Sequence, residues 1–425
     1  MNTKQMVDKI QIGEFNQVLL DVYADEKMLA YQKKRYVDAL STFKKQYGDG
    51  EVSIFSAPGR SEVGGNHTDH QYGEVLAASI NLDTIGVVKK TEDRMVRVLS
   101  DEYAEVVLTL DDLTVREEEM GTTAALVRGV IAGFAKKGYL FGGFQAYVTS
   151  DVLVGAGLSS SAAFETLMGT ILSELYNDGN ISAIEIAMIG QYAENVYFGK
   201  PCGLMDQMAC SVGSLVHIDF ANREQPVVEK VTFDMTEHGY YLCITDTKGS
   251  HADLTDEYAA IPREMSAVAK YFGKEVLRDV TEKDILDEMM PIRSKLGDRC
   301  VLRALHFLEE NKRVQEEVKA LKQGDVVSFL ACVKASGDSS YKYLQNIYTN
   351  NDVKTQNISL ALALSEMFLK KDGVCRVHGG GFAGTIQAFV KKEVVEEYQK
   401  YMDRIFGEDS CRVLQIRKYG GMKVL

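Results

Sequence analysis

The sequence of 425 residues lacks any apolar run near the roughly 18 residues that a membrane span requires, and its first residues are polar where a signal peptide would be apolar. Positive charge is also scarce. With 48 basic and 61 acidic residues the formal net charge is −13, which argues against nucleic acid or an anionic membrane as a partner. We therefore expect a cytoplasmic protein that binds neither nucleic acid nor membrane.

Cysteine and histidine are few and do not form the usual pairs. The seven cysteines are scattered from Cys202 to Cys411 without a Cys-x-x-Cys pair, which argues against both a disulfide framework and a structural zinc site. The seven histidines show no metal-type spacing except His67 and His70, which stand in a polar loop. We therefore expect reduced thiols and no metal centre built from these residues.

Two common nucleotide-binding motifs are missing as well. The Gly-x-x-x-x-Gly-Lys-Ser/Thr run of a Walker loop does not occur in the sequence. A glycine-rich loop at residues 155–161 has Ser160 where a dinucleotide fingerprint needs its third glycine. If this loop binds a nucleotide, it does so in another way.

The same loop nevertheless has the composition of a phosphate site, with two glycines and three serines directly before a helical pattern. The apolar residues of that pattern recur with helical spacing up to residues 177–179: Phe164, Leu167, Met168, Ile171, Leu172 and Leu175. A helix N-terminus attracts anions through its unpaired N–H groups and its dipole, and glycines let the backbone come close. We predict a phosphate-binding loop here; the alternative is a turn that only caps the helix.

A second helix is predicted from Ser182, which together with Glu185 forms a Ser-x-x-Glu capping box. This helix carries Glu194 and ends before Pro201, because proline forbids its continuation. Its apolar positions are Ile186, Ile189, Ala193 and Val196, of which Val196 is expected to be partly buried beside Glu194.

The remaining pattern is coarse. Strand-like runs occur at residues 52–55, 80–88, 140–148 and 241–244, and a mostly helical region extends over residues 263–369. The length suits two domains that are each large enough for a core of their own.

Four separated segments together resemble one family. Residues 57–76 contain Ala-Pro-Gly-Arg, Asn-His-Thr-Asp and Gly-Glu-Val-Leu in this order, a set that resembles the galactokinase signature. Residues 155–162 resemble the second motif of the wider GHMP small-molecule kinase family, and residues 379–384 resemble its third, glycine-rich motif. Residues 201–207 resemble the segment that carries the catalytic aspartate of galactokinases. The resemblance covers nearly everything from Ala57 to the C-terminus.

The resemblance implies an α+β fold of the two-domain GHMP kinase type, with the active site in the cleft between the domains. We expect an N-terminal extension over residues 1–28, packed as a helix on the outside, an N-terminal domain over 29–210 and a C-terminal domain over 211–425. The implied activity is transfer of the γ-phosphoryl group of ATP to the anomeric 1-hydroxyl of galactose, with Mg²⁺ bridging phosphate oxygens.

The resemblance also assigns the site residues. Arg60 and Asp206 are expected to form the catalytic pair, and Ser161 and Glu194 to hold Mg²⁺. The residues expected to bind the sugar are Asn66, His67, Asp69, Gly203 and Tyr258. Those expected to bind the nucleotide phosphates are Gly155, Ala156, Gly157, Leu158, Ser159, Ser160 and Ser161.

The chain departs from the family pattern mainly in the first motif. Asn66 stands where a glutamate is usual and is expected to face the 6-hydroxyl of the sugar, whereas Glu62 stands where an asparagine is common. Leu153 and Ala383 replace a proline and a glycine. The change at Asn66 keeps open a kinase for a related sugar, L-arabinose or N-acetylgalactosamine. The other alternative is a galactose- and ATP-binding sensor without turnover; the triple-serine motif is eroded in such proteins, whereas residues 159–161 keep it here, which favours catalysis.

Overall fold

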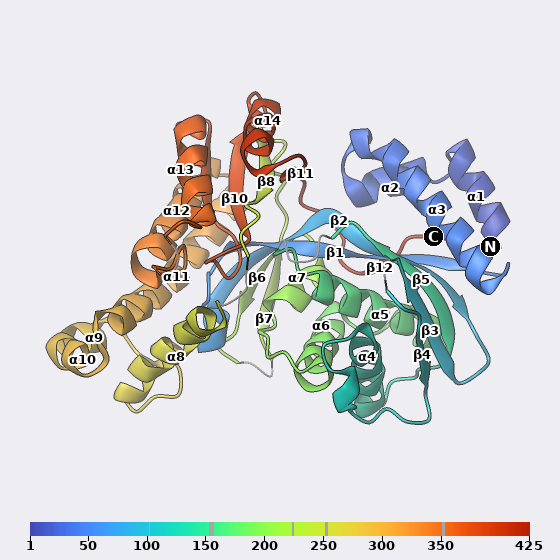
Figure 1. Ribbon diagram of the computed structural model, residues 1–425, viewed down its shortest axis with the longest axis horizontal. Coiled ribbons are helices and arrows are strands. Elements are labelled where there is room, and N and C mark those ends of the chain that lie inside the picture. Colours follow the sequence, from blue (N-terminus) through green and yellow to red (C-terminus); the bar gives the residue numbers. More distant parts are fainter. Residues whose placement is uncertain (102, 153–156, 223–224, 251–253, 351–352) are drawn as a thin grey trace.

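The computed structural model describes residues 1–101, 103–152, 157–222, 225–250, 254–350 and 353–425 (Figure 1). The described strands form an eight-stranded sheet and a four-stranded sheet, both accompanied by helices. This mixture of mainly antiparallel sheets and helices confirms the α+β class. None of the helices in these ranges is long and apolar enough to cross a membrane.

The large sheet has the strand order β12-β1-β2-β5-β3-β4, with β6 added to β2 and β7 added to β6. Among the described strands, β3 and β5 are the only pair that runs parallel. Its strands are β1 (Ser53–Gly64), β2 (Glu74–Lys90), β3 (Met95–Ser100), β4 (Val106–Thr109), β5 (Phe144–Ser150), β6 (Leu215–Asp219), β7 (Val227–Val231) and β12 (Met422–Lys423). Strands β6, β7 and β12 follow residue 210 in the chain and still pair within this sheet.

Strand β2 is buried along nearly its whole length because helices cover both faces of the sheet. One face carries the N-terminal helices, and the opposite face carries α4 to α7 (Figure 1). The helices of the second group are α4 (Thr123–Lys137), α5 (Ser160–Tyr176), α6 (Ala183–Tyr192), the π-helical segment η4 (Ala193–Phe198) and α7 (Met205–Val212).

The N-terminal segment forms α1 (Thr3–Ile12), α2 (Asn16–Tyr23) and the short turn η1 (Glu26–Met28), which precede α3 (Leu29–Tyr47). The expectation of a single helix over residues 1–28 was therefore wrong, because Gly13 adopts a left-handed conformation that ends α1. The apolar side chains of these helices pack on β1, β2 and β5, with Met6, Leu19, Tyr36 and Phe43 fully buried.

The small sheet has the order β11-β8-β10-β9 and lies beside the helical region (Figure 1). Its strands are β8 (Tyr240–Asp246), β9 (Gly373–Val377), β10 (Thr385–Lys391) and β11 (Cys411–Leu414). The accompanying helices are α8 (Thr255–Tyr271), α9 (Glu282–Asp287), α10 (Met289–Leu296), α11 (Asp298–Gln323), α12 (Val326–Ser339), α13 (Asn357–Leu369) and α14 (Val395–Phe406). Short helical turns are η2 (Asp69–Gln71), η3 (Glu117–Glu119), η5 (Leu277–Asp279) and the π-helical η6 (Ser340–Leu344).

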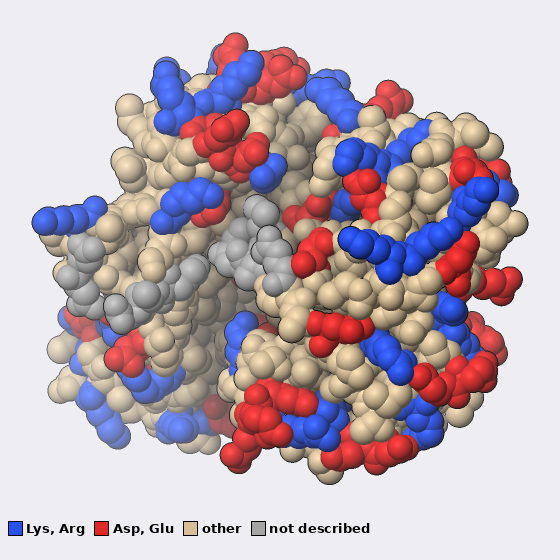
Figure 2. Space-filling view, turned by 45° about the vertical axis from the view of Figure 1, so that its right-hand side comes forward, with Lys and Arg blue, Asp and Glu red and all other residues tan. Residues whose placement is uncertain are grey.

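Charge is mixed over the face seen in Figure 2, where acidic and basic side chains alternate without an extended basic area. This distribution agrees with the negative formal charge of the whole chain.

Candidate functional site

The end of β1 positions Arg60 against the start of α7. Arg60 Nε donates to Asp206 Oδ1 over 2.8 Å and Nη2 donates to Oδ2 over 2.9 Å, so the guanidinium and the carboxylate form a bidentate ion pair. Irregularities in the β1–β2 register lie between Pro58 and Arg60 and between Glu62 and Gly64, where they re-aim the side chains of this stretch. The two residues predicted as a catalytic pair are thus in direct contact.

Electrostatics keep this pair charged. Burial acts to raise the pKa of Asp206, but Arg60 and the hydroxyl of Ser159 outweigh it, so the pKa lies below its usual range. Burial acts to lower the pKa of Arg60, and Asp206 raises it instead. Asp206 is therefore a carboxylate at neutral pH, with one third of its side chain exposed.

The phosphate-loop residues that follow Ala156 touch this pair directly. Arg60 Nη1 donates to the carbonyl of Gly157, the Arg60 N–H donates to the carbonyl of Leu158 over 3.1 Å, and Ser159 Oγ donates to Asp206 Oδ2. Ser159 adopts a left-handed backbone with φ of 59°, which turns its side chain toward Asp206 rather than back onto the helix. Gly155 and Ala156 lie outside the described residues.

Helix α5 begins at Ser160, directly after this loop, and ends at Tyr176. The predicted apolar stripe is confirmed, since Leu167, Met168, Ile171 and Leu172 are all buried beneath the large sheet. No side-chain hydrogen bond caps the start of α5 among the described residues. The first-turn N–H groups around Ser160 and Ser161 are therefore directed at the same space as Ser159, as an anion site requires.

Glu194 contacts Ser161 beside the start of α5, where the phosphate loop ends. Ser161 Oγ donates to Glu194 Oε1 over 3.1 Å, and the exposed ammonium of Lys200 lies 3.3 Å from the same oxygen. The Glu194 side chain is only 3% exposed. Two hard oxygen donors side by side fit Mg²⁺, which takes few protein ligands and keeps several waters. The described ranges contain no group of three or more His, Cys, Asp or Glu residues that could hold a metal, here or elsewhere.

Glu194 belongs to the π-helical segment η4, and this corrects one prediction. The i to i+5 hydrogen bonding of a π-helix inserts an extra residue into the turn and rotates the side chains that follow. Tyr197 is therefore buried at 6% exposure, whereas Val196, predicted to be partly buried, is 40% exposed. The start of the preceding helix at Ser182 is confirmed, with the Ser182 hydroxyl accepting from the Glu185 N–H.

Gln207 and Glu165 were not predicted as site residues, but they form a buried hydrogen-bonded group with Glu194. Gln207 Nε2 donates to Glu194 Oε2 over 2.8 Å and to Glu165 Oε2 over 3.0 Å. Glu165 is fully buried, and burial followed by the charge of Glu194 raises its pKa well above the usual range. A signal was present in the sequence, since Glu165 lies one helical turn after Ser161 and Gln207 follows Asp206 directly.

The loop between β1 and β2 presents His67 from a left-handed backbone with φ of 59°. His67 Nε2 lies 3.0 Å from the carbonyl of Gly380, which can only accept, so this nitrogen carries the proton. Burial lowers the pKa of His67 to about 4. The ring is therefore neutral at pH 7 and retains Nδ1 as a hydrogen-bond acceptor.

Asp69 and Gly203 meet at the rim of a cavity of about 220 Å³, whose lining residues are Asp69, Gln191, Asn195, Cys202, Gly203, Leu204 and Phe220. A Cβ at residue 203 would overlap Asp69 Oδ2, so only glycine lets this carboxylate lie here. Asp69 Oδ1 accepts from the His70 N–H over 2.9 Å. The structure thus brings together two residues that were predicted to bind the sugar.

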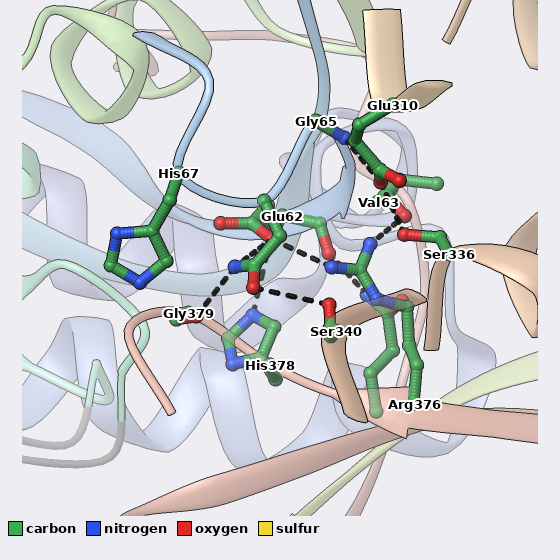
Figure 3. Close-up of polar contacts among 12 residues, drawn as sticks. Glu62, Val63, Gly65, His67, Glu310, Ser336, Ser340, Arg376, His378 and Gly379 are labelled. Atoms are coloured by element: carbon green, nitrogen blue, oxygen red, sulfur yellow. Dashed lines mark hydrogen bonds and ion pairs between the residues drawn. The ribbon is translucent and has the colours of Figure 1, made fainter. Parts of the chain in front are cut away.

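Asn66 is fully buried, and all four of its side-chain hydrogen-bonding positions have protein partners. Three of the partner residues, Glu62, Ser340 and Gly379, are labelled in Figure 3. Nδ2 donates to Glu62 Oε1 and to the Gly379 carbonyl, both over 2.8 Å. Oδ1 accepts from Asn346 Nδ2 over 2.8 Å and from Ser340 Oγ over 3.3 Å. A sugar could therefore bind Asn66 only if one of these bonds were broken.

The glycine-rich third motif follows β9, and Tyr258 of α8 packs against it. The Tyr258 hydroxyl donates to the Gly381 carbonyl over 2.6 Å, and its ring packs edge-on against Phe382 with centroids 5.3 Å apart. Burial raises the pKa of Tyr258 to about 12. A Cβ at residue 381 would overlap the carbonyl oxygen of Asn346, which explains the need for glycine at this position.

Comparison with known protein families gives two matches. Residues 125–214 match the GHMP kinases N terminal domain, and residues 41–90 match the galactokinase galactose-binding signature. The galactokinase of Actinobacillus pleuropneumoniae serotype 3 (strain JL03) is 32% identical over 369 residues, which are 85% of this chain and 91% of that protein. The galactokinase of Glaesserella parasuis serovar 5 (strain SH0165) is 30% identical over 362 residues, 84% and 90% of the two chains.

Solved structures give the same picture. Lactococcus lactis galactokinase, solved in complex with galactose, has a TM-score of 0.77 at 25% identity and covers 90% of this chain and 98% of its own. Methanococcus jannaschii mevalonate kinase has a TM-score of 0.60 at 16% identity, over 86% of this chain and 99% of its own, and so shares the fold.

Proposed function

Since the chain belongs to the galactokinase family of GHMP kinases, we propose that it transfers the γ-phosphoryl group of ATP to the anomeric hydroxyl of galactose. The observation that carries this proposal is the contact of Arg60 and Ser159 with one carboxylate, Asp206. This contact joins the phosphate loop to the loop that precedes Asp206, so that donor and acceptor substrates would meet at a single charged group.

Asp206 would orient the sugar hydroxyl and take its proton. Among the described residues, Oδ1 accepts only the Arg60 Nε–H, so it keeps a lone pair for the hydroxyl. Because Arg60 and Ser159 keep the pKa of Asp206 low, this carboxylate is a weak base. We therefore propose that it first fixes the direction of the hydroxyl and receives the proton late, as the new P–O bond forms and acidifies the oxygen.

The phosphate groups of ATP would lie at the start of α5. There the N–H groups of the first turn and the hydroxyls of Ser160 and Ser161 can donate to phosphate oxygens. Ser161 and Glu194 would hold Mg²⁺, which would supply the positive charge that a transferring phosphoryl group requires. Arg60 adds a fixed guanidinium beside the same group, and the buried Gln207 amide keeps Glu194 in place.

The sugar would lie between the first loop and the segment before α7. Neutral His67 offers an acceptor, Asp69 offers a carboxylate and Gly203 lets that carboxylate approach, while Tyr258 closes the side near the third motif. Polar groups of this kind lose binding energy when a wrong epimer leaves them unpaired, which gives selectivity among aldoses.

A coupled ADP-release assay tests the proposal with purified protein, Mg-ATP and four sugars: galactose, glucose, L-arabinose and N-acetylgalactosamine. We expect ADP release that depends on galactose, with the product identified as the 1-phosphate. A protein that releases no ADP with galactose, or that prefers another aldose, would contradict the assignment. Binding of sugar and ATP without turnover would identify the sensor instead.

A further inference from the structure

Glu62 lies two residues after Arg60 on β1, in a part of the strand that pairs regularly with β2. Side chains two residues apart in a strand project from the same face, about 7 Å from each other. This separation is comparable to the span of a pyranose ring with its hydroxyls. A sugar whose anomeric hydroxyl lies at Asp206 therefore has its opposite edge near Glu62.

The Glu62 carboxylate is anchored through one oxygen only. Oε1 accepts from Arg376 Nη2 and from Asn66 Nδ2, both over 2.8 Å. Among the described residues nothing donates to Oε2. This oxygen is nevertheless not one of the fully buried polar atoms that lack a partner, so part of its surface is accessible. Figure 3 shows it pointing away from Arg376, toward the side on which His67 lies.

The Asn66 amide, in contrast to the Glu62 carboxylate, has all of its hydrogen-bonding positions occupied. Its bonds to Gly379 and Asn346 tie the first loop to segments about 300 residues away, and His306 Nε2 lies 2.9 Å from its backbone carbonyl. The family pattern has a glutamate at this position and an asparagine at that of Glu62. Because the two side chains are in contact here, the departures amount to an exchange within one pair, which keeps one carboxylate and one amide.

We propose that Glu62 Oε2 accepts a hydrogen bond from a galactose hydroxyl at the edge of the ring opposite the anomeric carbon, and so determines sugar specificity in place of residue 66. Asn66 is a positioning residue that holds Glu62 and joins the first loop to the third motif. The inference rests on the proposed function, since it takes the anomeric hydroxyl to lie at Asp206. It replaces the expectation that Asn66 itself faces the 6-hydroxyl.

The first test measures kcat/KM with galactose and its 2-, 3-, 4- and 6-deoxy analogues on wild type and Glu62→Gln. A hydrogen bond to a carboxylate is a strong one, so wild type should lose about 10- to 100-fold on the 4- or the 6-deoxy sugar. In Glu62→Gln that penalty should shrink several-fold while the other penalties stay. Equal penalties in the two proteins, or coupling to the 2-hydroxyl alone, would overturn the proposal.

A matched control is Glu74→Gln. Glu74 is also a buried carboxylate next to this loop, but both of its oxygens have partners in His217 and Gln315. Its substitution should leave all four deoxy penalties unchanged. The melting temperature and the binding of a fluorescent ATP analogue report folding for every variant.

The second test is the reciprocal exchange. Asn66→Glu places two carboxylates together and Glu62→Asn leaves the buried Arg376 without its partner, so each single variant should lower kcat/KM for galactose at least about tenfold. The double variant restores one carboxylate and one amide and should recover most of this loss. A double variant no better than the worse single one would show that the pair is not an exchange.

Failure of the proposed function is separable from failure of this inference. If wild type does not phosphorylate galactose, the function is wrong; the same deoxy series is then measured by isothermal titration calorimetry, for the aldose that the protein binds. A change at one far-edge hydroxyl in Glu62→Gln still supports the inference, and its absence refutes it.

Discussion

Asp83 and Asp206 are both aspartates held by arginine, but they lie on opposite sides of the large sheet and differ in exposure. Asp83 is fully buried where the N-terminal helices cover β2. Its partners are Arg35 Nη1 at 2.6 Å, Arg417 Nη1 at 3.0 Å, the Tyr23 hydroxyl at 2.9 Å and the Ser56 hydroxyl. Burial acts to raise its pKa, and the two arginines together lower it.

Asp206 has one arginine, one serine and a side chain that is one third exposed. The same ion-pair chemistry therefore serves two purposes. A carboxylate that is buried among two arginines and two hydroxyls stabilises the packing around it, whereas a partly exposed carboxylate beside a glycine-rich loop can bind a substrate. The pKa is lowered in both Asp83 and Asp206, so the pKa alone does not distinguish the structural role from the binding role.

The largest effect is expected from Asp206→Asn. The amide keeps the shape of the side chain and removes its charge and basicity, so kcat should fall about 10²- to 10⁴-fold. Sugar and ATP binding should remain, as measured by isothermal titration calorimetry. Turnover within about tenfold of wild type would remove Asp206 from the reaction.

Asp83→Asn should break the other half of the comparison. It leaves two buried arginines without a full counter-charge, and we expect the free energy of unfolding to fall by about 3–5 kcal/mol. Urea denaturation measures this loss. The kcat of the folded fraction should stay at the wild-type value; a specific loss of kcat with unchanged stability would mean that Asp83 acts on the reaction.

Gly203→Ala sharpens the comparison at the sugar side. The added Cβ overlaps Asp69 Oδ2 and must displace this carboxylate, so KM for galactose should rise by about tenfold while KM for ATP stays the same. Gly86→Ala is the control, because a Cβ there makes only ordinary contacts on β2. An unchanged KM for the sugar in Gly203→Ala would place Asp69 outside the sugar site.

Glu194→Gln should raise the magnesium concentration at half-maximal rate several-fold, because an amide oxygen is a weaker ligand for a hard dication than a carboxylate. The rate is measured at fixed ATP over a magnesium titration. Glu185→Gln, on the preceding helix α6, is the control and should leave the titration unchanged. If both variants titrate like wild type, the metal lies elsewhere.

The smallest effect concerns pH. Burial lowers the pKa of His67 to about 4, below that of an unfolded histidine near 6.5, so the folded protein keeps the ring neutral in the window between these values. The unfolded state binds the extra proton there, so stability falls as pH decreases from about 6.5 to 4. The pH profiles of kcat/KM for wild type and His67→Gln should therefore have the same shape near pH 6.5. An inflection near pH 6.5 that is present in wild type and absent in His67→Gln would contradict the neutral ring.

The sequence by itself determined the elements whose signal is local. The apolar stripe of α5 and the start at Ser182 follow from spacing within a few residues, because burial of one helix face requires a fixed period. The order of the glycine-rich and acidic motifs was enough to indicate the family. The contact of Arg60 with Asp206 was expected from that resemblance and is present.

Only the tertiary structure decided which donors and acceptors meet. Ser159 turns onto Asp206, Tyr197 replaces Val196 in the interior because η4 is π-helical, and Asn66 is saturated by Gly379 and Asn346. The contacts of Ser159 and Asn66 join residues far apart in the chain, so no local period encodes them. Hydrogen-bond partners are selected by the packing of sheets and helices against one another. Among the residues that the structure describes, that packing gives every polar atom of the Asn66 amide a partner and leaves Glu62 Oε2 without a donor.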